Sequence, residues 1–199
     1  MQIQKEEIRT RILEAAGAEF LAAGFQAGSM RRIAKAAGIT AGNIYAYFPG
    51  KEALFIQVVA PAMKAIRQLM DTAGRESNPS MTTLANEIAD VFLAHRLPFR
   101  ILMEKAEGSP CAGIRQDLTQ TALERVNREY LPRLPAAFQH SDFAAALVHA
   151  ALSGIFVLLS CYDGNESQLR TSLQGLVQLL FTHLPQLEGS LEIKEEAAV

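Results

Sequence analysis

The stretch GITAGNIYAYFPGKEAL, residues 38–54, combines small residues and aromatic residues with very little charge. Thr40 is suited to cap a short helix, because its hydroxyl can accept a hydrogen bond from a free backbone N–H in the first turn. In that helix Ile44 and Phe48 face inward, and Pro49-Gly50 then breaks the chain. The pattern predicts a short helix with an apolar inner face and tyrosines on its outer face.

A second short helix is expected just before this one. Ser29 is a favourable N-cap residue, and Gly38 is suited to end the helix. Apolar residues between them follow the spacing of one helical face: Met30, Ile33, Ala34 and Ala37. The turn AAGIT joins the two helices, so the pair predicts a helix-turn-helix, a motif whose second helix can lie in the DNA major groove.

A longer helix precedes the pair and carries an apolar stripe at steps of four residues. The stripe consists of Ile8, Ile12, Ala16 and Phe20. Gly24 can end this helix as a left-handed cap, because glycine adopts positive φ without steric cost. Another helix is expected to start near Lys51 and to run toward Met70.

The remainder of the chain also shows helical periodicity and no sustained strand alternation, so the predicted fold class is all-α. The segment TAGRESNPS, residues 72–80, is the expected connection, with Ser80 as the next cap. Further helices are expected near residues 81–95, 99–107, 114–131, 141–162 and 166–184, with breaks at Pro98, Gly108-Ser109-Pro110, Pro132 with Pro135, and Gly164. The last helix shows a leucine-rich face, and the polar tail EGSLEIKEEAAV after it is expected to be frayed or disordered.

Charge is distributed unevenly along the 199 residues, whose formal net charge is −2. Residues 1–52 hold seven basic and five acidic side chains, a net charge of +2, and the remainder has a net charge of −4. A nucleic-acid role must therefore rest on a local basic patch. The positive net charge of residues 1–52 places any contact with a polyanion at the N-terminal end.

Two cysteines, Cys111 and Cys161, lie far apart without a CxxC motif, so neither a disulfide framework nor a zinc site is predicted. The N-terminus lacks the apolar segment of a secretory signal, which fits a cytoplasmic protein. Residues 143–161 contain no charged side chain and have the length of a membrane span. Because the stretch is rich in alanine and flanked by Asp142 and Asp163, we expect instead a helix buried in a bundle or a subunit interface.

The outer face of the second short helix suits the major groove of DNA. Ala41 and Gly42 are small enough to let the backbone approach DNA closely, and Asn43 can reach base edges. Alternatively, Asn43 is an ordinary residue of a helix surface.

The tyrosines and the lysine of the same stretch suit the DNA backbone. Tyr45 and Tyr47 can present hydroxyls to phosphate oxygens, and the Lys51 ammonium can reach the same backbone. Each residue also has a structural alternative, since the tyrosines could cover the small core and Lys51 could pair with a nearby carboxylate.

The segments ILEAAGAEFLAAGF and SMRRIAKAAGITAGNIYAYFPGKEALF, within residues 8–55, resemble the N-terminal DNA-binding domain of TetR-family transcriptional regulators. The resemblance includes Gly24-Phe25, Ala37-Gly38-Ile39, Ile44-Tyr45, Tyr47-Phe48 and Lys51-Glu52. The sequence departs from the family pattern at Met30, Ala46 and Gly50. These departures affect the strength of the contact with the DNA backbone and the identity of the bases that are read, but not the fold.

The resemblance implies roles for residues of this sequence. Ser29 would cap the second helix and touch a phosphate, and Arg31 would approach the DNA. Tyr47 and Lys51 would contact phosphates. The recognition surface would consist of Thr40, Ala41, Gly42, Asn43, Tyr45 and Ala46.

The resemblance also implies an N-terminal three-helix DNA-binding domain, residues 1–50, and a helical effector-binding and dimerisation domain, residues 51–199. The last two long helices would pair with their copies in a homodimer. Small residues at Ala150, Ala151, Ser153 and Gly154 would permit the close approach of helices.

An effector pocket would lie among the middle helices. Its polar candidates are Arg100, Glu104, Glu107, His149, Cys161 and Tyr162, and its apolar candidates are Phe92, Leu93, Leu102, Met103 and Phe156. The apolar lining predicts a hydrophobic or amphipathic small molecule. His149 has the alternative role of an interface histidine, and Glu104 and Glu107 the alternative of a solvated face.

The sequence thus predicts a repressor that leaves a palindromic operator when its effector binds. A constitutive DNA-binding regulator without a ligand, and a helical ligand-binding or interaction protein that does not read DNA, are the alternatives. The chain has no GxSxG, P-loop, HExxH or Rossmann motif, and its four histidines lack ligand spacing, so no enzyme, cofactor or metal site is predicted.

Overall fold

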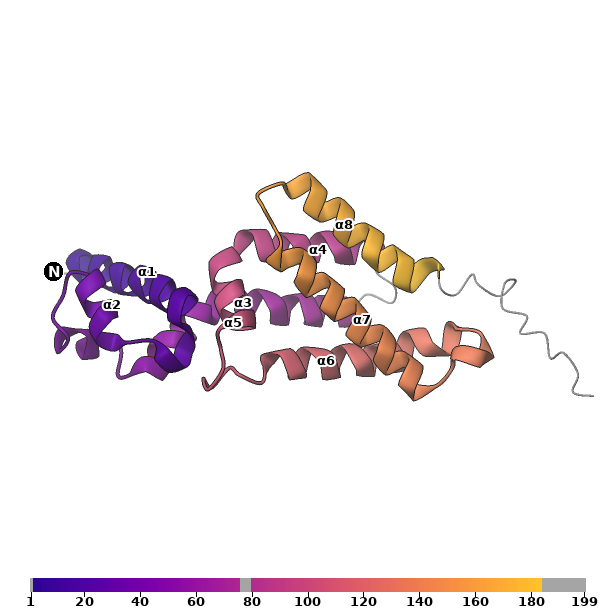
Figure 1. Cartoon of the computed structure of the whole chain (residues 1–199), viewed down its shortest axis with the longest axis horizontal. Coiled ribbons are helices and arrows are strands. Elements are labelled where there is room, and N and C mark those ends of the chain that lie inside the picture. The colour runs from indigo at the N-terminus through magenta and orange to yellow at the C-terminus, as the bar shows by residue number, and fades with distance from the viewer. Residues whose placement is uncertain (1, 76–79, 184–199) are drawn as a thin grey trace, which may run out of the picture. The chain divides into compact units, whose positions relative to one another are not determined.

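The computed structural model describes residues 2–75 and 80–183. All regular elements in these ranges are helices, which confirms the all-α prediction (Figure 1). They pack as two compact units, Met1–Thr72 with Asp90–Asp117, and Ala73–Ala89 with Leu118–Val199. The division predicted at residue 50 separates a DNA-binding domain from an effector-binding domain. Packing does not test a division by function, so it stays a prediction.

The first helix, α1, spans Gln2–Ala27 and is interrupted at Gly24, where the backbone has φ 73° and ψ 174°. Positive φ at this glycine agrees with the predicted end of the helix, although one more turn follows the break. Three residues of the predicted stripe, Ile12, Ala16 and Phe20, are fully buried, whereas Ile8 is half-buried.

The second helix, α2, spans Met30–Ala36 and begins and ends as its sequence predicts. The Ser29 hydroxyl accepts a hydrogen bond of 3.4 Å from the Arg32 backbone N–H. At the other end Gly38 has φ 69°, a conformation that disfavours any residue with a Cβ atom. Both boundaries are therefore fixed by local chemistry.

The predicted third helix is replaced by a turn and one 3₁₀ turn, η1, spanning Asn43–Ala46. Thr40 caps this turn as expected, because its Oγ1 accepts a hydrogen bond of 3.2 Å from the Asn43 backbone N–H. The expectation of an α-helix was wrong because glycine, asparagine, isoleucine and tyrosine are all weak helix formers, and 3₁₀ geometry suffices for so short a segment. Ile44 and Phe48 still face the core.

A long helix, α3, spans Lys51–Arg75 and forms the other wall of this core. Phe55 packs edge-to-face on Phe20 and on Phe25, with ring centroids 5.1 and 5.2 Å apart. Edge-to-face pairs are favourable beyond the area they bury. This aromatic cluster joins the start of α3 to the end of α1.

Two further helices follow, α4 over Met81–Ala94 and α5 over Arg96–Glu104. The Ser80 hydroxyl caps α4 by accepting a hydrogen bond of 3.2 Å from the Thr82 N–H. The predicted break at Pro98 was wrong, because the chain breaks at His95 and Pro98 lies in the first turn of α5. A proline is tolerated there since the first backbone N–H groups have no partner within the helix.

The end of α5 joins the end of α1 through backbone atoms. The Phe25 N–H donates a hydrogen bond of 3.0 Å to the Lys105 carbonyl oxygen. The break predicted at residues 108–110 follows at once, with Gly108 at φ 74°. Beyond it the buried Cys111 Sγ lies 3.7 Å from the Met63 Sδ, and burial raises the pKa of this thiol. Both cysteines are free thiols.

The next helix, α6, spans Ile114–Arg125, and its part from Leu118 onward belongs to the second unit. It continues as a π-helical turn, η2, over Val126–Tyr130. Two 3₁₀ turns, η3 over Leu131–Arg133 and η4 over Ala136–Phe138, lead to α7, Ser141–Ser160. The last helix, α8, spans Glu166–Gln178 and ends in a π-helical turn, η5, over Leu179–His183. The predicted polar tail lies outside the described residues.

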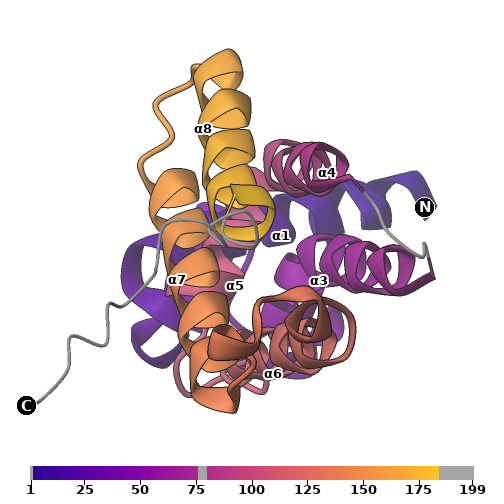
Figure 2. The same ribbon diagram turned by 90° about the vertical axis from the view of Figure 1, so that its right-hand side faces the viewer.

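The helices α7 and α8 lie side by side (Figures 1 and 2). Gly154 on α7 permits their close approach, since a Cβ atom there would lie 2.8 Å from Leu176 Cδ2. Buried residues on α8 confirm the predicted leucine face: Leu169, Leu173 and Val177. Leu184, the last residue predicted for this face, lies outside the described residues.

Two helices, Lys51–Asp71 and Ser141–Ser160, are long and apolar enough to cross a membrane by length and composition alone. The core helix of a soluble protein passes the same test. In α3 the apolar residues Leu54, Phe55 and Val59 are fully buried within the first unit. The apolar character of α3 is therefore explained by the protein core.

Candidate nucleic-acid interface

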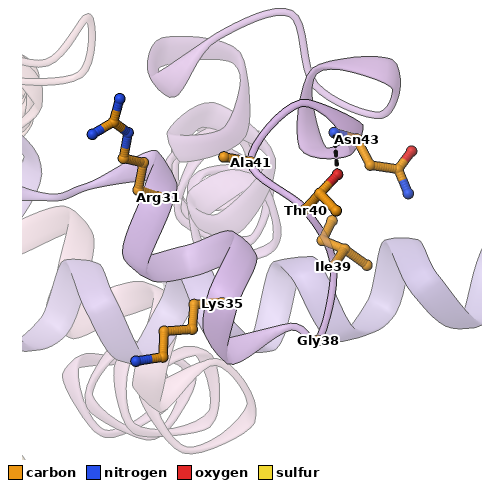
Figure 3. Close-up of a pocket in the computed structure, with 7 residues that line it drawn as sticks. All are labelled: Arg31, Lys35, Gly38, Ile39, Thr40, Ala41 and Asn43. Atoms are coloured by element: carbon orange, nitrogen blue, oxygen red, sulfur yellow. Dashed lines mark hydrogen bonds between the residues drawn. The ribbon is translucent and has the colours of Figure 1, made fainter.

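The helix-turn-helix forms an open depression of about 530 Å³ between α2 and the turn that leads to η1. Figure 3 shows Arg31 and Lys35 extending from α2, with Thr40 and Asn43 on the facing turn. The lining is completed by Gly38, Ile39 and Ala41. Residues 31, 40, 41 and 43 of the predicted DNA-contacting set therefore lie together.

The electrostatic character of this depression is positive. Arg31 and Lys35 are four residues apart, so they lie on one face of α2. No acidic side chain of the described residues lines the depression. Neither cation takes part in an ion pair among the residues that the structure describes. Both charges are available to an anionic partner.

The outer face of η1 and of the turn before it is exposed, and three of its residues are small. Ala41, Gly42 and Ala46 are all exposed, and Gly42 has open space where a Cβ atom would stand. The side-chain amide of Asn43 makes no hydrogen bond within the described residues, whereas its backbone N–H is bound by Thr40. A free amide can donate and accept at once, which is the pattern that an adenine edge requires.

The two tyrosines differ in their surroundings. Tyr45 has 54% of its surface exposed, so it does not cover the core as one alternative supposed. Tyr47 is half-buried and follows the buried Ile44 by three residues. An exposed phenol costs little to bring against a phosphate, because it loses no internal packing.

The start of α2 is held by an acidic residue of α1. The Ser29 N–H donates a hydrogen bond of 2.9 Å to Glu19 Oε1, and Arg32 Nε donates to the same oxygen at 2.8 Å. The Arg32 side chain lowers the pKa of the Glu19 carboxyl, and the bond to Ser29 adds to this effect. The paired carboxylate in turn raises the pKa of the Arg32 guanidinium. The Arg32 charge is thus already engaged within the motif.

Lys51, expected at the DNA backbone, is turned toward its own chain. Its Nζ donates hydrogen bonds of 3.0 Å to the Gln26 carbonyl and 3.3 Å to the Gly28 carbonyl. The same ammonium lies 4.7 Å from the centroid of the Phe25 ring. The structure therefore gives Lys51 three partners in the turn between α1 and α2.

Sequence reasoning missed three residues of this region, Glu19, Arg32 and Lys35. Lys35 could have been found, because it follows Arg31 by four residues on a short helix. Glu19 and Arg32 are thirteen residues apart in different helices, so no sequence periodicity connects them.

The predicted effector-pocket residues divide between the two units. In the first unit Phe92 and Met103 are buried, and Phe92 packs edge-to-face on Phe99 at 5.5 Å. Arg100 forms a partly exposed ion pair with Glu104 at 3.3 Å. Glu107 is exposed in the following turn.

In the second unit Phe156 and Tyr162 are half-buried, while His149 is exposed on α7. The predicted pocket stays a prediction. In the part of the chain that the structure describes, no group of three or more His, Cys, Asp or Glu side chains is arranged to hold a metal ion.

Known proteins share both this sequence pattern and this fold. The model of the family described as bacterial regulatory proteins, tetR family, matches residues 12–58. The chain is 31% identical over 150 residues to the uncharacterized HTH-type transcriptional regulator YhgD of Bacillus subtilis (strain 168), a match that covers 74% of each protein.

Two solved structures are similar over nearly their whole length. NalD, the secondary repressor of the MexAB-OprM multidrug efflux pump in Pseudomonas aeruginosa, is 27% identical with a TM-score of 0.62, over 92% of this chain and 98% of that chain. A transcriptional regulator (TerR/AcrR family) from Aquifex aeolicus VF5 shares the fold at 18% identity and a TM-score of 0.64, over 87% and 99% of the two chains. The chain therefore belongs to the TetR family of DNA-binding transcriptional regulators.

Proposed function

We propose that the protein is a repressor that binds an inverted-repeat operator as a homodimer and leaves it when a small hydrophobic molecule binds. The observation that carries the proposal is the open depression between α2 and η1, which two cations line with no acidic side chain beside them among the described residues. The DNA backbone is a dense line of negative charge, and cations that contact it supply much of the affinity. The Asn43 amide beside them supplies a group that can distinguish bases.

The proposed contacts follow from exposure and chemistry. Ser29 at the start of α2, Arg31 and Tyr47 would bind phosphate oxygens and fix the register. Lys35, which lines the same depression, would join them. The surface that faces the bases would be formed by Thr40, Ala41, Gly42, Asn43, Tyr45 and Ala46.

A homodimer is supported by the outward face of α7. Beyond Asp142 in the first turn, its exposed residues recur at helical spacing and carry no acidic, lysine or arginine side chain: Ala146, His149, Ala150, Ser153, Val157 and Ser160. Val157 has 59% of its surface exposed, a large exposed fraction for so apolar a residue. Covering this face with a second copy would remove apolar surface from water. His149 would then belong to the dimer interface rather than to a pocket.

Two-fold symmetry of the protein requires two-fold symmetry of the operator. The two helix-turn-helix motifs of a dimer would stand about one turn of B-DNA apart, roughly 34–36 Å. An effector that favours a different spacing would lower operator affinity by roughly 5- to 150-fold, for a coupling of about 1–3 kcal/mol.

A hydrophobic effector is supported by the apolar side chains of α4 and α5, among them Phe92, Leu102 and Met103. Repression is supported by NalD, which is itself a repressor. A cytoplasmic location is supported by the relatives, since bacterial transcriptional regulators act where the chromosome lies.

The experiment that tests the proposal is a selection of bound duplexes from a random pool by the purified full-length protein, at near-physiological salt. We expect an inverted repeat to be enriched. Its affinity should fall steeply as the salt concentration rises, because phosphate contacts release counterions.

The Asn43→Ala and Tyr47→Ala variants extend the test, because each alters a residue proposed to touch DNA. We expect both to lose affinity for the enriched duplex. If no sequence is enriched and neither substitution changes DNA binding, the helix-turn-helix does not read DNA and the proposal fails.

A further inference from the structure

A third cation lies beside the depression of the helix-turn-helix, and it comes from the first helix. Arg11 is exposed on α1, which packs against α2. A Cβ atom built on Gly38 would lie 3.8 Å from Arg11 Nη1. Gly38 follows the end of α2 and lines the depression (Figure 3). The guanidinium of Arg11 therefore reaches the edge of the surface that α2 and η1 form.

Two carboxylates on α1 are placed where they could neutralise this charge. Glu7 precedes Arg11 by four residues and Glu14 follows it by three, the spacings at which side chains on one helix meet. Neither forms an ion pair with Arg11, since the ion pairs within residues 2–75 and 80–183 join other side chains. The guanidinium instead lies beside Gly38, and its charge is not cancelled there.

The end of α2 does not use the guanidinium either. Three carbonyl groups of α2, those of Ile33, Ala34 and Lys35, already accept hydrogen bonds of 2.9 to 3.2 Å from the backbone that follows them. Arg11 donates no hydrogen bond to another of the residues that the structure describes. An arginine carries five N–H donors in a planar fork, so this side chain has its full donor capacity to offer to another molecule.

We infer that Arg11 binds a backbone phosphate of the operator, so that α1 contributes to the DNA interface beside Arg31 and Lys35. The inference deepens the proposed function and rests on it. A guanidinium can donate two parallel hydrogen bonds to one phosphate group. The contact breaks no hydrogen bond or ion pair among the described residues, so little is lost when it forms. A phosphate contact fixes the orientation of the protein on the duplex and carries no sequence information.

The test compares the Arg11→Gln variant with the wild-type protein on the enriched duplex and on a random duplex, over a series of salt concentrations. We expect the affinity for both duplexes to fall by a similar factor, about fivefold, because the lost contact is an exposed charge that reads no base. The slope of log affinity against log salt should become shallower by about 0.9 for each bound protomer.

Two variants frame this result. Lys64→Gln removes the same charge from an exposed position of α3 and is the matched control, which should change neither affinity nor slope. Arg11→Lys keeps the positive charge but not the planar fork. It should keep the wild-type slope, because the number of neutralised phosphates is the same.

Uncharged phosphate substitutes locate the contact on the duplex. A set of enriched duplexes, each with one methylphosphonate at a different position, should bind the wild-type protein more weakly wherever a cation is contacted. The Arg11→Gln variant should become insensitive at one position of each half-site and stay sensitive at the others. Lys64→Gln should show the wild-type pattern at every position.

An unchanged slope together with a wild-type methylphosphonate pattern in Arg11→Gln overturns the inference. A lowered melting temperature with an unchanged slope overturns it as well, because Arg11 then serves the packing of α1 on α2. If the wild-type protein binds enriched and random duplexes equally, operator reading itself fails and the inference falls with it. A selective wild type beside an Arg11→Gln protein of unchanged slope refutes the Arg11 contact alone.

Should Arg11→Gln not fold, ¹H–¹⁵N spectra of arginine side chains in the wild-type protein test the same point. The Arg11 guanidinium signals should shift when the enriched duplex is added, and they should return as added salt releases the DNA. Signals that stay unshifted on a duplex that is fully bound contradict the inference.

Discussion

Glu19 on α1 accepts a hydrogen bond of 2.9 Å from the backbone N–H of Ser29, the residue at which α2 begins. The carboxylate thus satisfies a backbone donor at a helix start, where negative charge is favoured. The same oxygen binds Arg32, so one side chain fixes two groups of α2. Substitution at this position should consequently affect the folding of the whole motif.

The Glu19→Gln variant should be less stable than the wild type by about 1 kcal/mol at pH 7, because a charge-assisted acceptor becomes a neutral one. Urea unfolding followed by far-ultraviolet circular dichroism measures this difference, and it suits a chain that contains no tryptophan. The neighbouring Glu14→Gln, at an exposed position of the same helix, is the matched control and should have no effect.

The same pair of proteins should differ in their response to acid. The folded pKa of Glu19 lies below the ordinary value of 4.5, so its stabilising effect is complete above that value. It is lost as the pH falls through the lower folded pKa, because both states then bind the proton. The difference between wild type and variant should therefore shrink below about pH 4.5. A difference that stays constant down to pH 3 would contradict the assignment.

Substitution of Gly42 should affect the stability of the protein and its affinity for DNA in opposite directions. Gly42 has φ −73° and no neighbour where a Cβ atom would stand, so folding does not require glycine there. We expect Gly42→Ala to raise the free energy of unfolding by about 0.4–1 kcal/mol through the unfolded chain. Its affinity for the operator should nevertheless fall about tenfold, if the backbone approaches DNA closely at this point.

Gly38→Ala is the matched control for Gly42→Ala. Gly38 has φ 69°, so alanine there should cost about 1–2 kcal/mol of stability. Thermal melts and operator titrations of both variants make the comparison. A Gly42→Ala protein that binds DNA as well as the wild type would remove the close approach from the proposed interface.

Asn43→Ala should reduce operator affinity by about 1–3 kcal/mol and relax the preference at one base pair of each half-site. The salt dependence should remain that of the wild type, because the amide carries no charge. Fluorescence anisotropy with duplexes substituted at single positions resolves this pattern. A uniform loss across all duplexes would instead indicate that Asn43 contacts the backbone.

Tyr130→Phe should lower the stability of the second unit by about 1 kcal/mol. The Tyr130 hydroxyl lies 2.8 Å from the Phe181 carbonyl oxygen and 3.2 Å from that of Leu180, and it can donate to either. The hydroxyl thereby holds η5 against η2. Amide hydrogen exchange at residues 176–181 would report the local loosening.

Tyr130 should also make the protein sensitive to alkali. Burial raises the pKa of Tyr130 to about 12 from 10. Because the unfolded chain loses this proton first, stability should fall as the pH rises from about 10. Tyr130→Phe should lack this part of the pH dependence, and equal slopes for the two proteins between pH 10 and 12 would contradict the assignment.

Val157→Glu should convert the proposed dimer into a monomer. A charge placed on the apolar outward face of α7 would be desolvated in the interface without a partner, so dimer affinity should fall by 100-fold or more, about 3 kcal/mol. Sedimentation equilibrium measures the change. Gln116→Glu, which adds the same charge at an exposed position of α6, should leave the association state unchanged.

Local signals in the sequence predicted much of the helix-turn-helix. Ser29 is a cap because its hydroxyl reaches the next turn. Gly24 interrupts α1 and Gly38 follows the end of α2, and each takes a positive φ. Where two local signals compete, the sequence misled. Pro98 reads as a helix breaker, yet it stands in a first turn where the missing N–H is harmless.

The sequence predicted the exposed residues of the candidate site but not the contacts that hold them in place. Asn43 was proposed from its place on a short helix and Arg31 from the family resemblance, and both line the depression. The two hydrogen-bond acceptors of Lys51 lie 23 and 25 residues away in sequence and are backbone carbonyls. Because every residue has a backbone carbonyl, the residue types at these positions do not indicate the contact. Long-range pairs of this kind depend on tertiary packing, which periodicity does not encode.

The hydrogen bond between the Phe25 N–H and the Lys105 carbonyl is made entirely by main-chain atoms. Such a joint places no demand on the side chains at either position. Mutation can accordingly replace residues around it over long evolutionary times while the helices keep their attachment.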